Sequence, residues 1–206
     1  SRAFFDTRHI AIDLVPGFAG CDGARHLLRE NAARIETLRA EASVDYGAVM
    51  PLLRALQEAL FAGLEALYGA DSGLDPHALL LPCEVGDDDV RERLYVHEAD
   101  DGALELCLAI DGRTLAQLEA TAVDDALGDD ALGDTLPVLE GLSHLVYIAE
   151  AARRERPVSA LELETQAEVD KLAICLLHRW DDARAQFERL VHRLYCQFEL
   201  VAEAAL

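Results

Sequence analysis

Two consecutive segments in the last third of the chain place acidic, imidazole and ammonium side chains at helical spacing among apolar residues. Glu140 and His144 lie four residues apart in the first segment, so they share one face of a helix. The second segment carries Glu168 and Lys171, and Lys171 is the only lysine in the chain. Carboxylates and an imidazole can bind a divalent metal ion, whereas a lysine among carboxylates is typical of an ion-pair network. These side chains are the first candidates for chemistry.

Two antiparallel helices are predicted to position these side chains. Pro137 is suited to a first helical turn and predicts a helix over 137–155. Ser159 and Glu162 form a Ser-x-x-Glu capping box, which predicts a second helix over 159–179. Because the connection between them is short, the two helices should lie side by side and run in opposite directions.

Antiparallel packing also predicts which side chains are level. If the helices pair about residue 157, His144 is level with Lys171, and Tyr147 is level with Glu168. Helix rotation is not fixed by the sequence, so Glu164 or Asp170 joins the group only if the helices are offset or rotated. The predicted cluster therefore consists of Glu140, His144, Tyr147, Glu168 and Lys171, with Ser143 at its edge.

Two interpretations of this cluster compete. In the structural one, Lys171 pairs with Glu168 or Glu140 and the remaining members complete the hydrogen bonds, so that a polar network inside the bundle is satisfied. In the functional one, Glu140, His144 and Glu168 bind a divalent transition metal whose bound water attacks a substrate, with Lys171 or Tyr147 assisting. A lysine level with the histidine would repel a metal ion at close range. The structural network is favoured, and no cofactor is expected.

Length and charge limit the class of protein. With 206 residues, 51% of them hydrophobic, the chain can bury a sizeable core, and we expect one domain over 1–206. The formal net charge is -21, and its distribution is uneven: nine acids and seven bases in 1–70, eighteen and three in 71–134, and twelve and eight in 135–206. Such an acidic chain is not expected to bind nucleic acid. The charge serves solubility or forms a face for a basic protein partner.

The sequence also predicts a cytoplasmic protein that does not span a membrane. It has no apolar run approaching the roughly 18 to 20 uncharged residues of a membrane helix. Its five cysteines are scattered, without a Cys-x-x-Cys motif, which is typical of the reducing cytosol.

The remaining segments predict helices with one β-hairpin. The N-terminal region, 1–70, should contain a helical hairpin, and the last third should end in a helix that follows Asp181 or Asp182 and has an apolar face. The middle region should contain the hairpin and a short helix. The predicted elements are helices over 22–42 and 51–69, strands over 91–97 and 104–110, and the short helix over 114–122.

An immediate repeat of Asp-Asp-Ala-Leu-Gly over 124–133 is interpreted as a flexible acidic loop, with calcium binding as the alternative. The predicted fold is therefore mainly α: a bundle of about five to six helices with one β-hairpin insertion, or α+β by strict count.

The sequence contains no Gly-rich phosphate loop, no His-Glu-x-x-His and no Gly-x-Ser-x-Gly motif. We therefore expect an acidic helical protein that acts through protein contacts, as an adaptor, a regulator or a subunit of a complex. The alternative is a small hydrolase, with or without a metal, whose site lies between the helices 137–155 and 159–179. A closed cluster with an exposed apolar patch elsewhere would favour the first class, and a pocket that opens onto the cluster would favour the second.

Overall fold

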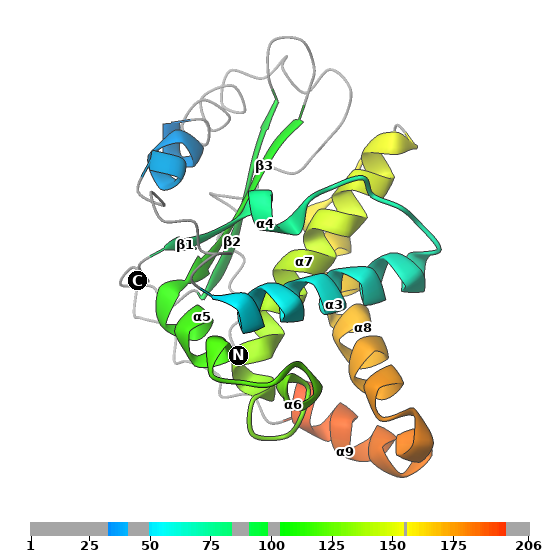
Figure 1. Cartoon of the computed structure of the whole chain (residues 1–206). Helices are drawn as coiled ribbons and strands as arrows, with labels where there is room; N and C mark the ends of the chain where they lie inside the picture. Colours follow the sequence, from blue (N-terminus) through cyan, green and yellow to red (C-terminus); the bar gives the residue numbers. More distant parts are fainter. Residues whose placement is uncertain (1–32, 41–49, 84–90, 99–103, 155, 197–206) are drawn as a thin grey trace, which may run out of the picture.

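The computed structural model describes residues 33–40, 50–83, 91–98, 104–154 and 156–196. Helices dominate this part of the chain and surround a small sheet (Figure 1), which confirms the predicted mainly α fold with a β insertion. No helix among these residues is both long and apolar enough to cross a membrane.

The elements follow one another in this order: a helical stretch over 33–40, α3 (Pro51–Tyr68), α4 (Pro76–Leu79), β1 (Leu80–Cys83), β2 (Glu92–Glu98), β3 (Leu104–Asp111), α5 (Gly112–Glu119), α6 (Val123–Ala126), α7 (Leu132–Arg153), α8 (Ala160–His178), the 3-10 turn η2 (Trp180–Asp182) and α9 (Ala183–Tyr195).

The sheet has the strand order β1-β3-β2, with β3 in the centre. Strands β2 and β3 pair antiparallel, with Leu94 opposite Leu108, as the predicted hairpin requires. Strand β1 was not predicted. It pairs with β3 in parallel, and Leu80 also lies opposite Leu108. Its four residues are too few to give a periodic pattern, and its partner is distant in the sequence.

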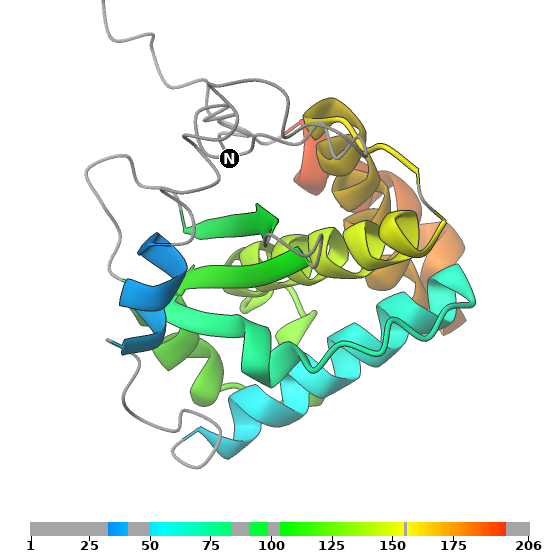
Figure 2. The ribbon, with the colours of Figure 1, turned by 90° about the horizontal axis from the view of Figure 1, so that it is seen from above.

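The two faces of the sheet pack against different helices. Leu94, Leu108 and Ile110 belong to the main core, which includes residues of α3, α7 and α8. The alternate positions Tyr95 and Cys107 pack with Ile35 and Leu38 of the helical stretch over 33–40. This stretch therefore packs on the sheet (Figure 2). The predicted helical hairpin would have packed it on α3 instead. The remainder of the predicted helix over 22–42 lies outside the described residues.

Helix α3 matches its prediction at both ends. It begins at Pro51, and Gly69 follows it with φ 61°, the left-handed conformation that favours glycine at a helix end. The leucine repeat of this helix, from Leu53 to Leu67, predicts an inward apolar stripe, but Leu67 is 41% exposed and that position is wrong.

Helix α7 begins at Leu132, earlier than the predicted start at Pro137, which lies inside the helix. The early turn is anchored because Leu132 is fully buried and the hydroxyl of Thr135 donates to the carbonyl of Ala126 at 2.6 Å. The acidic repeat over 124–133 therefore spans most of α6, a turn and the first residues of α7. The prediction of a flexible loop is wrong.

The turn within this repeat is tied to α9. Asp129 accepts hydrogen bonds from Arg189 and from Arg193, the latter at 2.8 Å, and Arg179 lies 3.6 Å away. These arginines neutralise Asp129, which is one of the carboxylates available to the calcium alternative. The apolar face predicted for the last helix runs from Phe187 through Leu190 to Phe198 and Val201. Leu190 is buried and Phe187 is 47% exposed, while Phe198 and Val201 lie outside the described residues.

A close approach between α7 and the sheet depends on Gly141. A Cβ atom placed there would lie 2.4 Å from Cδ1 of Leu108 and 3.1 Å from Cγ of Glu92. Leu108 is fully buried and cannot move aside. The missing side chain therefore lets α7 lie directly on β2 and β3, next to the candidate residues Glu140 and His144.

Candidate metal centre

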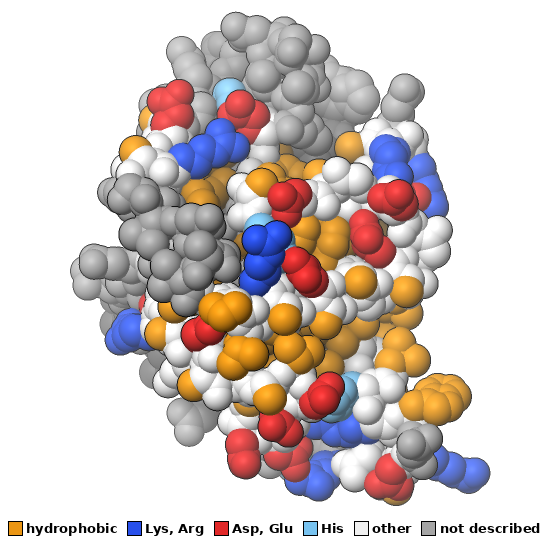
Figure 3. Space-filling view, viewed as in Figure 1, with side chains coloured by type: hydrophobic (Ala, Val, Ile, Leu, Met, Phe, Trp, Pro, Cys, Tyr) orange, Lys and Arg blue, Asp and Glu red, His pale blue; other side chains and the backbone are white. Residues whose placement is uncertain are grey.

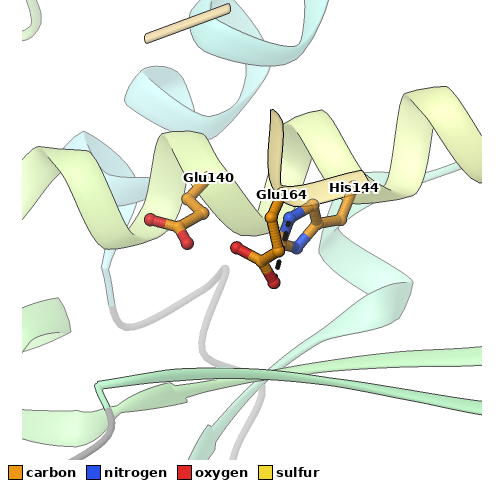
Figure 4. A group of neighbouring side chains, drawn as sticks. All are labelled: Glu140, His144 and Glu164. Atoms are coloured by element: carbon orange, nitrogen blue, oxygen red, sulfur yellow. Dashed lines mark ion pairs between the residues drawn. The ribbon is translucent and has the colours of Figure 1, made fainter. Parts of the chain in front are cut away.

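Four side chains from three elements converge where α7, α8 and β2 meet: Glu92, Glu140, His144 and Glu164. We call this group the centre. Glu140 and His144 come from successive turns of α7, Glu164 reaches down from α8, and Glu92 comes from β2. Figure 4 shows Glu140, His144 and Glu164 pointing toward one another above the sheet. One possible ligand atom from each of these three lies within 4.8 Å of those of the other two.

The imidazole of His144 lies between two carboxylates. Its side chain is only 2% exposed. Nδ1 is 3.5 Å from Oε1 of Glu92, and Nε2 is 4.0 Å from Oε1 of Glu164 (Figure 4). Both distances exceed those of good hydrogen bonds. Within the described part of the chain, neither ring nitrogen of His144 has a hydrogen-bond partner, and nor does Oε1 of Glu92.

Buried polar atoms without partners are uncommon, because each has given up its hydration. Here they face one another across a narrow space. Ligand atoms held at about 2.0–2.2 Å from a common ion lie roughly 3 to 3.5 Å apart. The three candidate ligand atoms therefore need only small side-chain rotations to surround one ion, which would satisfy the buried imidazole.

Lys171 and Glu168 lie beside the centre. The ammonium of Lys171 donates to Glu140 at 2.9 Å and to Glu168 at 2.5 Å. Glu168, predicted as a metal ligand, is not in the group of ligand atoms within 4.8 Å of one another among the described residues, and Glu164 joins Glu140 and His144 there instead. His144 was predicted to be level with Lys171 but lies next to Glu164, because α7 and α8 are offset from the predicted level.

The net charge around Lys171 bears on its predicted repulsion of a metal ion. With all four carboxylates ionised and a neutral imidazole, Glu92, Glu140, Glu164 and Glu168 and the single ammonium of Lys171 give 4 negative and 1 positive charges, or -3. A divalent cation reduces this to -1. The carboxylates thus outweigh the repulsion, and the ammonium of Lys171 is itself held by two of them.

Burial and mutual repulsion shift the titration of the centre. Burial, with the neighbouring Glu140 and Glu92, raises the pKa of Glu164 to about 7, although His144 opposes this. Burial also raises the pKa of Glu92. Burial alone would lower the pKa of His144, but the facing carboxylates, Glu92 first, outweigh it and raise this pKa. The group thus holds protons that a bound cation would displace.

Tyr147 lies outside the centre. It was predicted to be level with Glu168, but its hydroxyl donates to Glu162 at 2.6 Å. Arg156 also pairs with Glu162, and its guanidinium carbon lies 5.2 Å from the centre of the Tyr147 ring. The Ser159 hydroxyl caps α8 as predicted, accepting from the backbone of Glu162 at 3.2 Å. The Glu162 side chain does not close the capping box but bonds to Tyr147 and Arg156, which form a second polar group near the helix connection.

A third polar group occupies the same interface and is fully hydrogen-bonded. Asp170, completely buried, accepts from Ser143 at 2.5 Å and from Tyr68 at 2.5 Å. Its other carboxylate oxygen accepts from Gln166 at 2.9 Å. We call these four residues the Asp170 network. Ser143, placed by sequence at the edge of the cluster, belongs to it.

Sequence reasoning missed Glu92 and gave Glu164 only a conditional place. Glu92 did carry a signal, because it occupies the same alternate positions of β2 as the buried Leu94 and Val96. A carboxylate at an inward position of a strand indicates a polar partner in the core. The partner, α7, could not be identified from the local sequence.

Access to the centre is from the side of α7 and α8. The side chains of Glu140 and Glu168 are 22% and 35% exposed, while those of Glu92 and Glu164 are each 14% exposed. Two hollows of the described surface lie elsewhere, one beside His77 and one of about 480 Å³ beside Trp180. The residues of the centre line neither of these hollows, and they are only partly closed to solvent.

Comparisons with protein-family models, with curated proteins and with solved structures found no match for this chain. The class of protein is therefore defined by its own fold and geometry: a mainly α protein with a candidate metal centre between a helix pair and the edge strand of a small sheet.

Proposed function

We propose that this protein binds a divalent transition-metal ion through Glu140, His144 and Glu164. The observation that carries the proposal is the buried imidazole of His144, whose nitrogens lack hydrogen-bond partners in the described structure and whose Nε2 is directed toward Glu164. Two carboxylates and one imidazole suit Zn²⁺, Mn²⁺ or Fe²⁺. The i, i+4 spacing of Glu140 and His144 on α7 provides two ligands on one rigid face.

The chemistry that such an ion supports is hydrolysis. An ion held by three protein ligands keeps a coordination position for water, and the ion lowers the pKa of that water so that it becomes a nucleophile near neutral pH. The partial exposure of Glu140 supports access of water and of a small substrate to the ion. We therefore propose metal-assisted hydrolysis as the reaction class.

The test is elemental analysis combined with titration calorimetry, on protein purified without chelator and without nickel resin. We expect one ion per chain and loss of binding in His144→Ala and in Glu164→Gln. His192→Ala is the matched control, because this histidine is exposed on α9 and should leave binding unchanged. A wild-type chain that binds none of Zn²⁺, Mn²⁺ and Fe²⁺ at micromolar concentration would refute the proposal. A metal-binding chain would then be screened with phosphoesters.

A second candidate function, contact with a protein partner, is favoured by exposed apolar side chains of α8, of the turn after it and of α9. Leu161, Val169, Leu177 and Trp180 are 68%, 53%, 50% and 72% exposed, and Phe187 of α9 is 47% exposed. Figure 3 shows apolar side chains over this part of the molecule, at its lower right. Large exposed apolar residues that follow one helix are typical of an interaction surface.

We take a second copy of the chain as the partner to test. The region 135–206 carries twelve acids and eight bases, a net -4, against -15 for 71–134, so two copies repel each other less through this region than through the middle one. Sedimentation of the wild type should show a dimer, which Trp180→Ser combined with Leu161→Ser should dissociate. Leu52→Ser, on α3 and 44% exposed, is the control. A monomeric wild type would reject self-association.

A further inference from the structure

We propose that Glu92 is a positioning residue of the metal centre. Its carboxylate accepts a hydrogen bond from the N–H at Nδ1 of His144 and so directs Nε2 toward the ion. This inference rests on the proposed metal-binding function and extends it to a residue of the sheet. It predicts that the ion touches α7 and α8 directly and is linked to β2 only through the imidazole ring.

The two edges of the imidazole face different carboxylates. Oε1 of Glu92 is 3.5 Å from Nδ1, and Oε1 of Glu164 is 4.0 Å from Nε2. A neutral imidazole carries a proton on one nitrogen and a lone pair on the other. Whichever nitrogen keeps the proton therefore decides which carboxylate can share an ion with the ring.

Several observations favour the proton on Nδ1. The nearer carboxylate is that of Glu92, and its Oε1 is buried and lacks another hydrogen-bond partner in the described structure. At the opposite edge of the ring, Nε2 lies 4.0 Å from Glu164, which belongs with Glu140 and His144 to the 4.8 Å group of ligand atoms. Metal-bound histidines commonly donate their second N–H to a carboxylate in this way.

Glu92 is excluded as a fourth ligand of the same ion by the shape of the ring. An ion in the ring plane at Nε2 lies on the far side of the imidazole from Nδ1, and therefore far from the Glu92 carboxylate. One ion cannot take the lone pair of one nitrogen and also sit against the carboxylate that faces the other.

The fold supplies a reason for Glu92 to reach this position. Its Cγ would lie 3.1 Å from a Cβ at position 141, so a side chain there would press on Glu92 as well as on Leu108. Gly141 thus leaves room for a strand carboxylate beneath α7, one turn from His144. The centre is built across the contact between the sheet and the helix.

The first test is NMR of the full chain labelled with ¹⁵N at histidine and loaded with Zn²⁺, with His144→Gln to assign the signals. We expect Nε2 of His144 to be metal-bound and Nδ1 to carry a proton. This measurement needs no substitution at Glu92, so it stays decisive even if a Glu92 variant fails to fold.

The second test is Zn²⁺ affinity by competition with a chelating dye. Glu92→Gln keeps the shape of the side chain but removes its charge, and we expect about 10- to 100-fold weaker binding. Glu105→Gln, at an exposed position of β3, is the matched control and should bind within about twofold of the wild type.

The outcomes separate the two proposals. If the wild type does not bind Zn²⁺ at all, the proposed function fails and this inference fails with it. If the wild type binds Zn²⁺ through Nδ1, or if Glu92→Gln binds as tightly as Glu105→Gln, the metal centre stands and the positioning role of Glu92 is refuted.

Discussion

Ser143 and His144 are neighbours in α7, yet they enter two buried polar groups of opposite character. Ser143 belongs to the Asp170 network, in which one carboxylate accepts hydrogen bonds from three neutral donors at 2.5 to 2.9 Å. His144 belongs to the centre, where neither ring nitrogen finds a partner in the described residues and the nearest carboxylate oxygens are 3.5 and 4.0 Å away.

The difference separates a stabilising group from a candidate functional one within a single interface. The Asp170 network satisfies its polar atoms and links α3, α7 and α8, as a structural element should. The centre leaves buried atoms unsatisfied and gathers carboxylates against one another, which lowers stability. Sites of unfavourable local energy within an otherwise satisfied core are expected where a protein binds a ligand.

The largest expected effect is the loss of the Asp170 network. Asp170→Ala leaves the hydroxyls of Ser143 and Tyr68 without their acceptor in the core, so we expect the free energy of unfolding to fall by about 3 kcal/mol. Urea denaturation would measure it. Asp130→Ala, at an exposed position, is the control and should change stability by less than about 0.5 kcal/mol. A loss below about 1 kcal/mol for Asp170→Ala would contradict the structural role.

A substitution of Glu164 should increase the free energy of unfolding, whereas that of Asp170 decreases it. Because its folded-state pKa is about 7, above the ordinary value of 4.5, the folded protein holds this proton more tightly than the unfolded chain does. Its contribution to stability is present in full below about pH 4.5 and is lost as the pH rises through 7. Allowing for the partial exposure of the side chain, the loss should be about 2 kcal/mol.

Glu164→Gln should therefore stabilise the metal-free protein by about 2 kcal/mol at pH 8 and by little at pH 4.5, while it abolishes metal binding. Chemical denaturation in the presence of a chelator at both pH values measures the effect. Equal stability of variant and wild type at pH 8 would show that the carboxylates of the centre do not repel one another.

A smaller effect is expected at Lys171, which joins the centre to Glu168. In Lys171→Met, Glu140 and Glu168 lose their ammonium partner, but both are partly exposed and can be hydrated, so unfolding should become easier by only about 1 kcal/mol. Removal of the positive charge should tighten Zn²⁺ binding severalfold. Weaker Zn²⁺ binding in this variant would indicate that Lys171 orients Glu140 as a ligand.

The smallest effect is expected at the group near the helix connection. Tyr147→Phe removes the hydrogen bond to Glu162, whose side chain is 36% exposed and is also paired with Arg156. We expect a loss of less than about 0.5 kcal/mol and unchanged Zn²⁺ affinity. A clear loss of Zn²⁺ binding would return Tyr147 to the functional group predicted from the sequence.

The sequence predicted those features that depend on local pattern. Alternation gave the two strands of the hairpin to within about one residue, and the capping serine gave the start of α8. It also placed Glu140 and His144 on one face of a helix. It could not give the offset between α7 and α8, which decides that Glu164 and not Glu168 faces His144. Nor could it bring Glu92 to the site, because that contact joins distant parts of the chain.

The ammonium of Lys171 has a practical consequence. Lys171 is the only lysine of the sequence, and its side chain is 7% exposed. Apart from an α-amino group, reagents that acylate amines therefore have one target in this protein, and they reach it only when the contact between α7 and α8 loosens. The rate of acylation at Lys171 thus measures how often this helix pair separates, and a slower rate with Zn²⁺ present would report that an ion holds it closed.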